Sequence, residues 1–205
     1  YRGGTYSQDK TDFGKPWFLR LGGQLHTGHS LSNTYTNSGE YFFPTASNPD
    51  GYPNSDREKL WGNSQYYFMA EKMLYREPDS YNRGLTGWFK AKYSPWERRG
   101  STTKGLYGGF AYEGIGKRDK DILYLGYAHM LVNEGVLERS RNQSLCTEVV
   151  GCEVSDYQGA LEIGYNAQLK PYLFITPKLY YVVNPNVRKD LGNILTAGIE
   201  FRLSY

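Results

Sequence analysis

The sequence predicts an all-β fold, an antiparallel β-barrel that crosses a membrane. Three observations lead to this prediction. The last nine residues, from Ala197 to Tyr205, alternate apolar or aromatic side chains with others and end on a tyrosine. Eight segments of the chain have strand character, and their charged residues fall almost entirely in one of the two alternating rows. Strands that cross a bilayer must close into a barrel, because an open edge in lipid leaves backbone groups unpaired.

Composition agrees with this fold class but does not decide it. The 205 residues are enough for one large β domain or two small ones, and we expect a single β-barrel domain over residues 1–205. Aromatic residues make up 16% and glycine occurs 24 times, which suits short strands with aromatic girdles. A soluble sandwich or lectin-like domain has a similar composition. The net charge of +3 is not concentrated in any run, so we expect no nucleic-acid partner.

The first four segments, expected at about 17–28, 62–75, 85–93 and 104–113, each alternate an apolar row with a polar or small one. The fifth, 122–132, is apolar on both sides, so its facing stays open. The sixth, 157–169, alternates most regularly, with Leu161 and Ile163 in its apolar row. The seventh, 173–183, contains Pro177, which lacks a ladder donor and usually marks an edge or a bulge. The eighth runs from 194 to 205.

The polar rows carry isolated charges among glycine, alanine and glutamine, as expected of a wall that faces water inside a barrel. This pattern favours the barrel over a soluble sandwich. Lys72 is an exception, because it lies in the apolar row near the end of its segment. A lysine at the bilayer midplane would cost about 2–4 kcal/mol, so we expect it to reach the interface. The expected pore-lining residues are Arg20, Gln24, Tyr67, Glu71, Trp88, Lys90, Lys92, Glu113, Glu162, Lys178, Glu200 and Arg202.

The connections between segments run long, short, short, short, long, very short and medium. Counted back from a periplasmic C-terminus, the external connections are the two long ones, at about 29–61 and 133–156, the medium one at 184–193 and the short one at 94–103. Cys146 and Cys152 lie in the second long connection. Their spacing predicts a disulfide clip in an oxidising compartment and fits no zinc template.

An enzyme inside the barrel is the second class of function. The inward glutamates could form a glycosidase pair, but the sequence gives no separation between them. The three histidines, His26, His29 and His129, belong to no catalytic triad or metal-ligand motif. We therefore expect no enzymatic activity, no cofactor and no metal.

The stretch 170–185 begins Lys-Pro-Tyr-Leu-Phe, contains an internal proline and ends Val-Asn-Pro. It resembles the penultimate strand of the carbohydrate-selective porins of the OprB family. The stretches 73–78 and 105–107, the latter followed by Gly126-Tyr127-Ala128, are also similar to that family. The usual Gly-Gly after Asn-Pro is replaced by Asn186-Val187, which puts the geometry of that loop in doubt.

The resemblance implies a sixteen-stranded porin in the outer membrane of a Gram-negative bacterium, with this chain as its C-terminal half. The chain starts without a signal peptide, and its inward glycines and alanines would fill a closed eight-stranded barrel poorly. We therefore expect an incomplete wall.

The resemblance also implies passive diffusion of small sugars such as glucose. A general or differently selective channel is the alternative, and a soluble sugar-binding β domain is a further one. The expected partners are small sugars, outer-membrane lipid and lipopolysaccharide, and the barrel-assembly machinery through the strand that ends at Tyr205. Aromatic surfaces suit the C–H faces of sugars and charged groups suit their hydroxyls. Arg20, Trp88 and Lys90 are expected to form a sugar-contacting strip.

Overall fold

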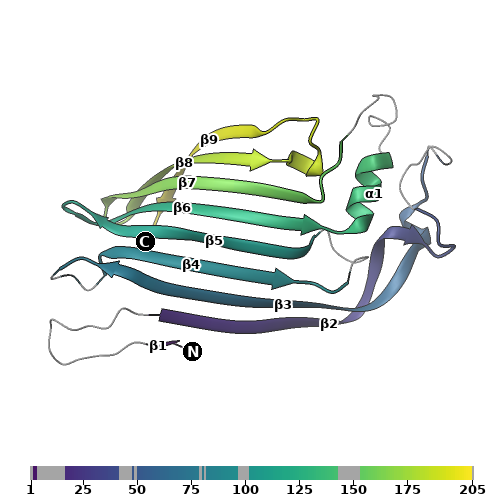
Figure 1. The fold of residues 1–205 in the computed structure, drawn as a ribbon, viewed down its shortest axis with the longest axis horizontal. Coiled ribbons are helices and arrows are strands. Elements are labelled where there is room, and N and C mark those ends of the chain that lie inside the picture. Colours follow the sequence, from purple (N-terminus) through teal and green to yellow (C-terminus); the bar gives the residue numbers. More distant parts are fainter. Residues whose placement is uncertain are drawn as a thin grey trace.

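The computed structural model describes residues 2–3, 17–41, 48, 50–78, 80, 82–96, 102–142 and 153–204. The described part contains nine strands, one α-helix and two short 3-10 helices (Figure 1). Their bounds are β1 (Arg2–Gly3), β2 (Trp17–Thr36), η1 (Asn54–Asp56), β3 (Arg57–Arg76), β4 (Gly84–Tyr93), β5 (Thr102–Ile115), β6 (Arg118–Val132), α1 (Glu134–Asn142), β7 (Tyr157–Lys170), β8 (Leu173–Val183), η2 (Pro185–Val187) and β9 (Ile194–Leu203).

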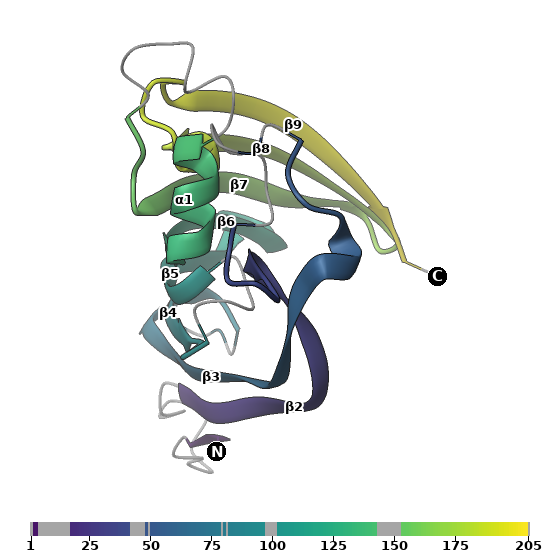
Figure 2. The same ribbon diagram turned by 90° about the vertical axis from the view of Figure 1, so that its right-hand side faces the viewer.

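The strands form one antiparallel sheet in which each strand pairs with its neighbours in the sequence, from β1 to β9. The eight expected segments correspond to β2–β9, and β1 is an additional strand of two residues beside the start of β2. Viewed along the strands, the sheet curves into an open trough (Figure 2). Among the described residues, the first and last strands do not pair, which agrees with the expected incomplete wall. The count of sixteen strands stays a prediction.

The sheet is a single layer along most of its length. Leu161 is 39% exposed, Ile163 42% and Phe201 69%, so these apolar side chains do not pack against a second protein layer. Apolar rows of this size are unfavourable in water, because the hydrophobic effect drives apolar surface out of water. Rows left uncovered by protein therefore suit contact with another apolar medium. The all-β, antiparallel fold class is therefore confirmed, and the sandwich alternative is wrong for the described part of the chain.

The pairing also resolves the facing of β6, which the sequence pattern left open. Leu125 lies opposite Phe110 on β5 and Ile163 on β7, so it belongs to the apolar row. Tyr124 lies opposite Ala111 and Gly164 and therefore points to the other side. The apolar face thus runs continuously across the neighbouring strands.

Strands β2 and β3 extend further than expected into the range 29–61. The pairs Ser30–Leu60 and Thr36–Arg57 prolong both strands, and the connection shrinks to residues 37–56. A register shift between His26 and His29 interrupts the alternation, which is why the sequence pattern ends there. The strand extensions beyond this point lack a continuous apolar row.

The expected loop 133–156 contains helix α1 of nine residues. Asn133 caps the helix, because its Oδ1 accepts a hydrogen bond from the backbone N–H of Val136 at 2.9 Å. The helix lies at the same end of the sheet as η2 and the far end of β2 (Figure 1). No helix in the described part of the chain has the length and apolarity needed to span a membrane. Cys146, Cys152 and Tyr205 lie outside the described residues, so the disulfide stays a prediction.

Pro177 neither ends nor bulges its strand. It lies opposite Ile199 in an unbroken register between β8 and β9. The register shift between β7 and β8 occurs instead between Gln168 and Lys170, beside the two-residue turn. No bulge forms at Pro177, but the β7–β8 pairs are interrupted opposite it, between Gly164–Lys178 and Ala167–Ile175, as its missing ladder donor predicts.

Candidate functional site

The twelve residues expected to line a pore share one face of the sheet, which we call the polar face. The pairings place Arg20 opposite Met69, Met69 opposite Lys90, and Glu71 opposite Trp88. The remaining eight fall in the same register on β2–β5 and β7–β9: Gln24, Tyr67, Lys92, Glu113, Glu162, Lys178, Glu200 and Arg202. That this face lines a pore stays a prediction.

Aromatic rings on the polar face lie over glycines of the neighbouring strand. A Cβ added to Gly22 would lie 2.4 Å from Cζ of Tyr67, so this ring rests directly against the β2 backbone. The Tyr124 ring covers Gly164 in the same way, again with 2.4 Å to its Cζ. Glycine leaves room for a close approach that any side chain would block. These glycines of the polar face therefore let aromatic rings lie against the backbone of the neighbouring strand, which the pattern of a single strand does not predict.

Three cations of the polar face, Arg20, Lys90 and Arg202, lie over aromatic rings. Lys90 Nζ is 6.0 Å from the ring centroid of Tyr67 and 5.7 Å from that of Tyr107. Arg202 Cζ lies 4.3 Å from the ring centroid of Phe174. Such contacts hold a cation near an apolar surface while its charge stays available to solvent or ligand.

Charges of both signs occur on this face, and some of them pair. Lys178 forms an ion pair with Glu200 across β8 and β9. The hydroxyl of Tyr124 donates a hydrogen bond to Oε1 of Glu162 at 2.9 Å. Tyr124 was not among the expected residues, because the pattern of its segment did not reveal its facing. In the described part of the chain, no group of three His, Cys, Asp or Glu residues could hold a metal ion.

The strip expected from Arg20, Trp88 and Lys90 spans two adjacent lines of paired residues that run across the strands. Arg20 and Lys90 lie in one line, on either side of Met69, and Trp88 lies in the neighbouring line. The Trp88 indole lies beside Gly109, where an added Cβ would be 3.1 Å from its Nε1. The three side chains therefore belong to one region of the polar face.

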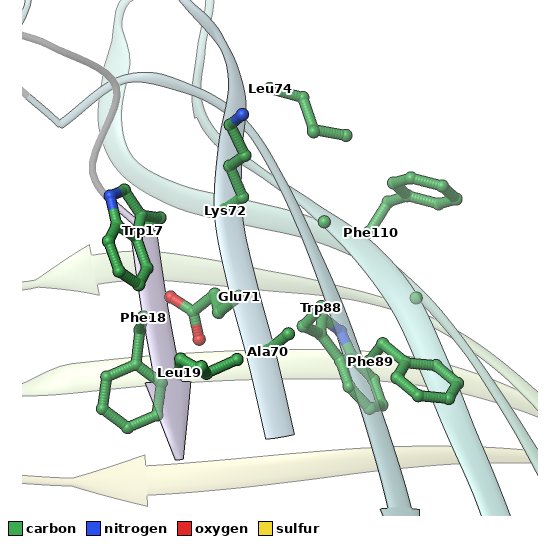
Figure 3. Close-up of a pocket in the computed structure, with 12 residues that line it drawn as sticks. Trp17, Phe18, Leu19, Ala70, Glu71, Lys72, Leu74, Trp88, Phe89 and Phe110 are labelled. Carbon is green, nitrogen blue, oxygen red and sulfur yellow. The ribbon is translucent and has the colours of Figure 1, made fainter. Parts of the chain in front are cut away.

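Lys72 lies on the opposite, apolar face. It borders a hollow of about 640 Å³ that is lined largely by apolar residues, among them Trp17, Leu74 and Phe110 (Figure 3). Its position is four residues before the end of β3 at Arg76. Lys72 forms no ion pair with the described residues. An amine so placed can extend along apolar surface toward a polar boundary.

The end of the sheet that carries α1 has its own small packed region. Val187 of η2 is only 2% exposed, and Asn133 at the start of α1 is 1% exposed. Partial burial, together with the nearby carboxylates of Glu138 and Glu134 on α1, raises the pKa of Tyr41. In the adjoining loop, the Arg188 guanidinium donates to Asp190 and lowers the pKa of that carboxyl.

Comparisons with known proteins agree with the fold and the two-faced sheet. The family model described as carbohydrate-selective porin, OprB family, matches residues 18–205. Porin B of Pseudomonas aeruginosa is 25% identical over 245 residues, covering 94% of this chain and 53% of that protein. The solved structure titled "High pH structure of Pseudomonas putida OprB" superposes with a TM-score of 0.77 at 18% identity, and it shows the same fold. It covers 100% of this chain and 47% of the other.

The chain thus spans about half the length of the relatives it matches. Homologues in this family are β-barrel proteins of the Gram-negative outer membrane, and the chain is assigned to that membrane. The sequence of stretch 170–185, the antiparallel sheet and the family model all indicate the same family. The chain belongs to the carbohydrate-selective porins of the OprB family.

Proposed function

We propose that the chain forms part of the wall of an outer-membrane channel through which small sugars, such as glucose, diffuse passively. Its membership of a porin family supports a channel rather than an enzyme. In this proposal the polar face is the lumen wall and the apolar face contacts lipid. The long connections, α1 and η2 then lie at the external mouth, and the short turns face the periplasm.

The observation that carries the proposal is the flat arrangement of aromatic rings on the polar face. The Tyr67 and Trp88 rings lie against glycines of adjacent strands, so each offers a face to the lumen. Sugars have apolar C–H faces that pack on such rings, and hydroxyls that bond to charged or amide groups beside them. Lys90 supplies a donor close to the Tyr67 ring and to the ring of Tyr107.

Mixed charge is a second argument for a neutral solute. Lys178 pairs with Glu200, and Glu71 lies opposite Trp88 one row from Lys90. A ring of one sign would favour ions of the other, whereas alternating signs favour neutral polar molecules. This supports a sugar-preferring pore over an ion-selective one.

Single-channel recording of the full-length protein in planar bilayers tests the proposal. We expect glucose to reduce the current in a concentration-dependent way, and Trp88→Ala to weaken this block about threefold or more. Phe89→Ala, the neighbour on the apolar face, should leave the block unchanged. Equal block by glucose in Trp88→Ala and the native protein would remove Trp88 from the sugar path.

A general channel is the alternative function. Swelling of protein-containing vesicles in glucose and in a zwitterion of similar size separates the two, because a general pore admits both at similar rates. Lipid, lipopolysaccharide and the barrel-assembly machinery, through the strand that ends at Tyr205, remain the partners that we propose. Detergent-dependent extraction would distinguish this protein from a soluble sugar-binding domain.

A further inference from the structure

A second, more enclosed hollow lies on the polar face, toward the end of the sheet that carries α1. Its volume is about 240 Å³, and all of its lining residues are polar. It is separate from the strip of Arg20, Trp88 and Lys90, none of which lines it. The lining residues are Gln24, His26, Asn63, Ser64, Gln65, Lys92, Ser94 and Thr102.

The strand register brings these side chains together. Gln24 lies opposite Gln65, and His26 lies opposite Asn63, across β2 and β3. Lys92 on β4 lies opposite Tyr67, two residues along β3 from Gln65. Three amides, an imidazole and an amine thus converge from three adjacent strands. Tyr67, whose ring lies over Gly22, is paired with Lys92 but does not itself line the hollow.

One buried polar atom of this hollow has no partner within the described part of the chain, whereas Ser64 Oγ accepts a hydrogen bond from Trp96 Nε1 and Ser94 Oγ donates one to the Ser64 carbonyl. The Oδ1 atom of Asn63 is buried and has no hydrogen-bond partner among the described residues. Burying an acceptor without a donor costs about 1–3 kcal/mol, and a turn of the amide toward the hollow would let a ligand hydroxyl donate to it. A buried acceptor without a partner, beside amides and an ammonium that line the same hollow, is typical of a binding site.

The charge in the hollow has one sign. Lys92 forms no ion pair with the described residues, and the lining includes no carboxylate. Elsewhere on the polar face the cation Lys178 is neutralised by Glu200. An ammonium without a protein carboxylate nearby favours a ligand that brings its own negative charge.

We propose that this hollow is a subsite for sugar acids, that is, polyhydroxylated monocarboxylates. Lys92 binds the carboxylate, and the amides of Gln24, Gln65 and Asn63 bind neighbouring hydroxyls, since each amide both donates and accepts. This inference rests on the proposed function, because it assumes that the polar face lines a carbohydrate channel.

Current-noise analysis of the full-length protein in planar bilayers tests the subsite, with glucuronate, glucose and acetate as probes. We expect glucuronate to bind roughly fivefold more tightly than glucose, and acetate to show no measurable block. Lys92→Gln should bring glucuronate down to the affinity of glucose, because it removes the charge but keeps a polar side chain. Asn63→Leu should weaken glucuronate and glucose alike by roughly threefold or more.

Two variants serve as matched controls. Gln158→Leu removes an amide from β7 that lies on the polar face, in the same line of cross-strand pairs as Lys92 but outside the hollow. Lys72→Gln removes a lysine from the apolar face. Both should keep the native preference for glucuronate, and folded protein is verified for every variant by its conductance without sugar.

The outcomes separate the subsite from the proposed function. Equal affinity for glucuronate and glucose in the native protein, or a preference that survives Lys92→Gln, overturns the subsite while glucose passage stands. Block by acetate at the same strength as glucuronate also overturns it, because the hollow would then be an anion site that ignores hydroxyls. A channel that passes neither sugar faster than a zwitterion of equal size overturns the proposed function itself.

Discussion

The Trp88 indole on β4 lies against Gly109 on β5, so closely that an added Cβ would be 3.1 Å from the indole nitrogen. The two residues are directly paired in the sheet, and the ring occupies the space that a side chain at 109 would fill. The glycine therefore has a positional role, because it lets the largest aromatic side chain lie flat on the wall.

Gly109→Ala should destabilise the protein by about 1–3 kcal/mol. The new Cβ would lie 2.2 Å from the backbone oxygen of Leu125, which cannot move without disturbing the β5–β6 ladder. Denaturant unfolding in lipid vesicles measures the change. Gly198→Ala is the matched control, because nothing lies within 4 Å of the added atom there, and a similar loss at both positions would contradict the argument.

Ile163→Lys should cost about 2–4 kcal/mol of stability in vesicles, because it puts a charge on the apolar face well inside a strand. Ala160→Lys on the polar face of the same strand should cost much less, since its amine remains in water. The same unfolding measurement compares them. If both substitutions had equal effects, the assignment of lipid to the apolar face would be wrong.

Lys72→Leu should stabilise the protein slightly, by less than about 1 kcal/mol. Lys72 already lies near the end of β3, where its amine can reach the interface, so little penalty remains to be removed. A gain of several kcal/mol in vesicle unfolding would instead mean that the amine is held at the bilayer centre.

Asn133→Ala should destabilise α1 by about 1 kcal/mol, because it removes the acceptor for the backbone N–H of Val136. Hydrogen exchange of the helix amides reports the loss locally. Asn133→Ser keeps a capping oxygen and should restore most of the protection. Unchanged exchange in Asn133→Ala would show that packing, rather than the cap, holds the helix.

Asn186→Val should destabilise the loop after β8 by about 1–2 kcal/mol, whereas Asn186→Gly should be close to neutral. Asn186 has φ 54° and Val187 has φ 57°, a region that glycine and asparagine adopt more readily than β-branched residues. This explains the resemblance to a family with Gly-Gly there, because the left-handed backbone is kept with different side chains. Thermal unfolding of the two variants would measure the difference.

Much of the sheet could be predicted from alternation alone. In β7 the apolar row with Leu161 and Ile163 was assigned from the sequence, because lipid and water select different residues at every second position. In β6 the same reasoning failed, since Tyr124 and Leu125 are both apolar enough for either side. Its facing required the pairing with β5 and β7.

The candidate site was harder to predict than the strands. His26 and Asn63 lie inside the expected segments 17–28 and 62–75 but were not among the expected pore-lining residues, because the pattern of one strand does not show that they pair across β2 and β3. The sequence pattern loses its period near the register shift beyond His26. Contacts between a ring and a glycine could not be predicted from the sequence either, because each contact joins residues of different strands, such as Tyr67 and Gly22.

A wall one residue thick has an evolutionary consequence. In the proposed channel, odd positions along β7 are selected for contact with lipid and even positions for which solutes pass. Transport preference can then drift through substitutions at positions such as Gln158 or Glu162 while Leu161 and Ile163 keep the strand anchored. Such a fold can change which solute it passes without losing the residues that insert it into the membrane.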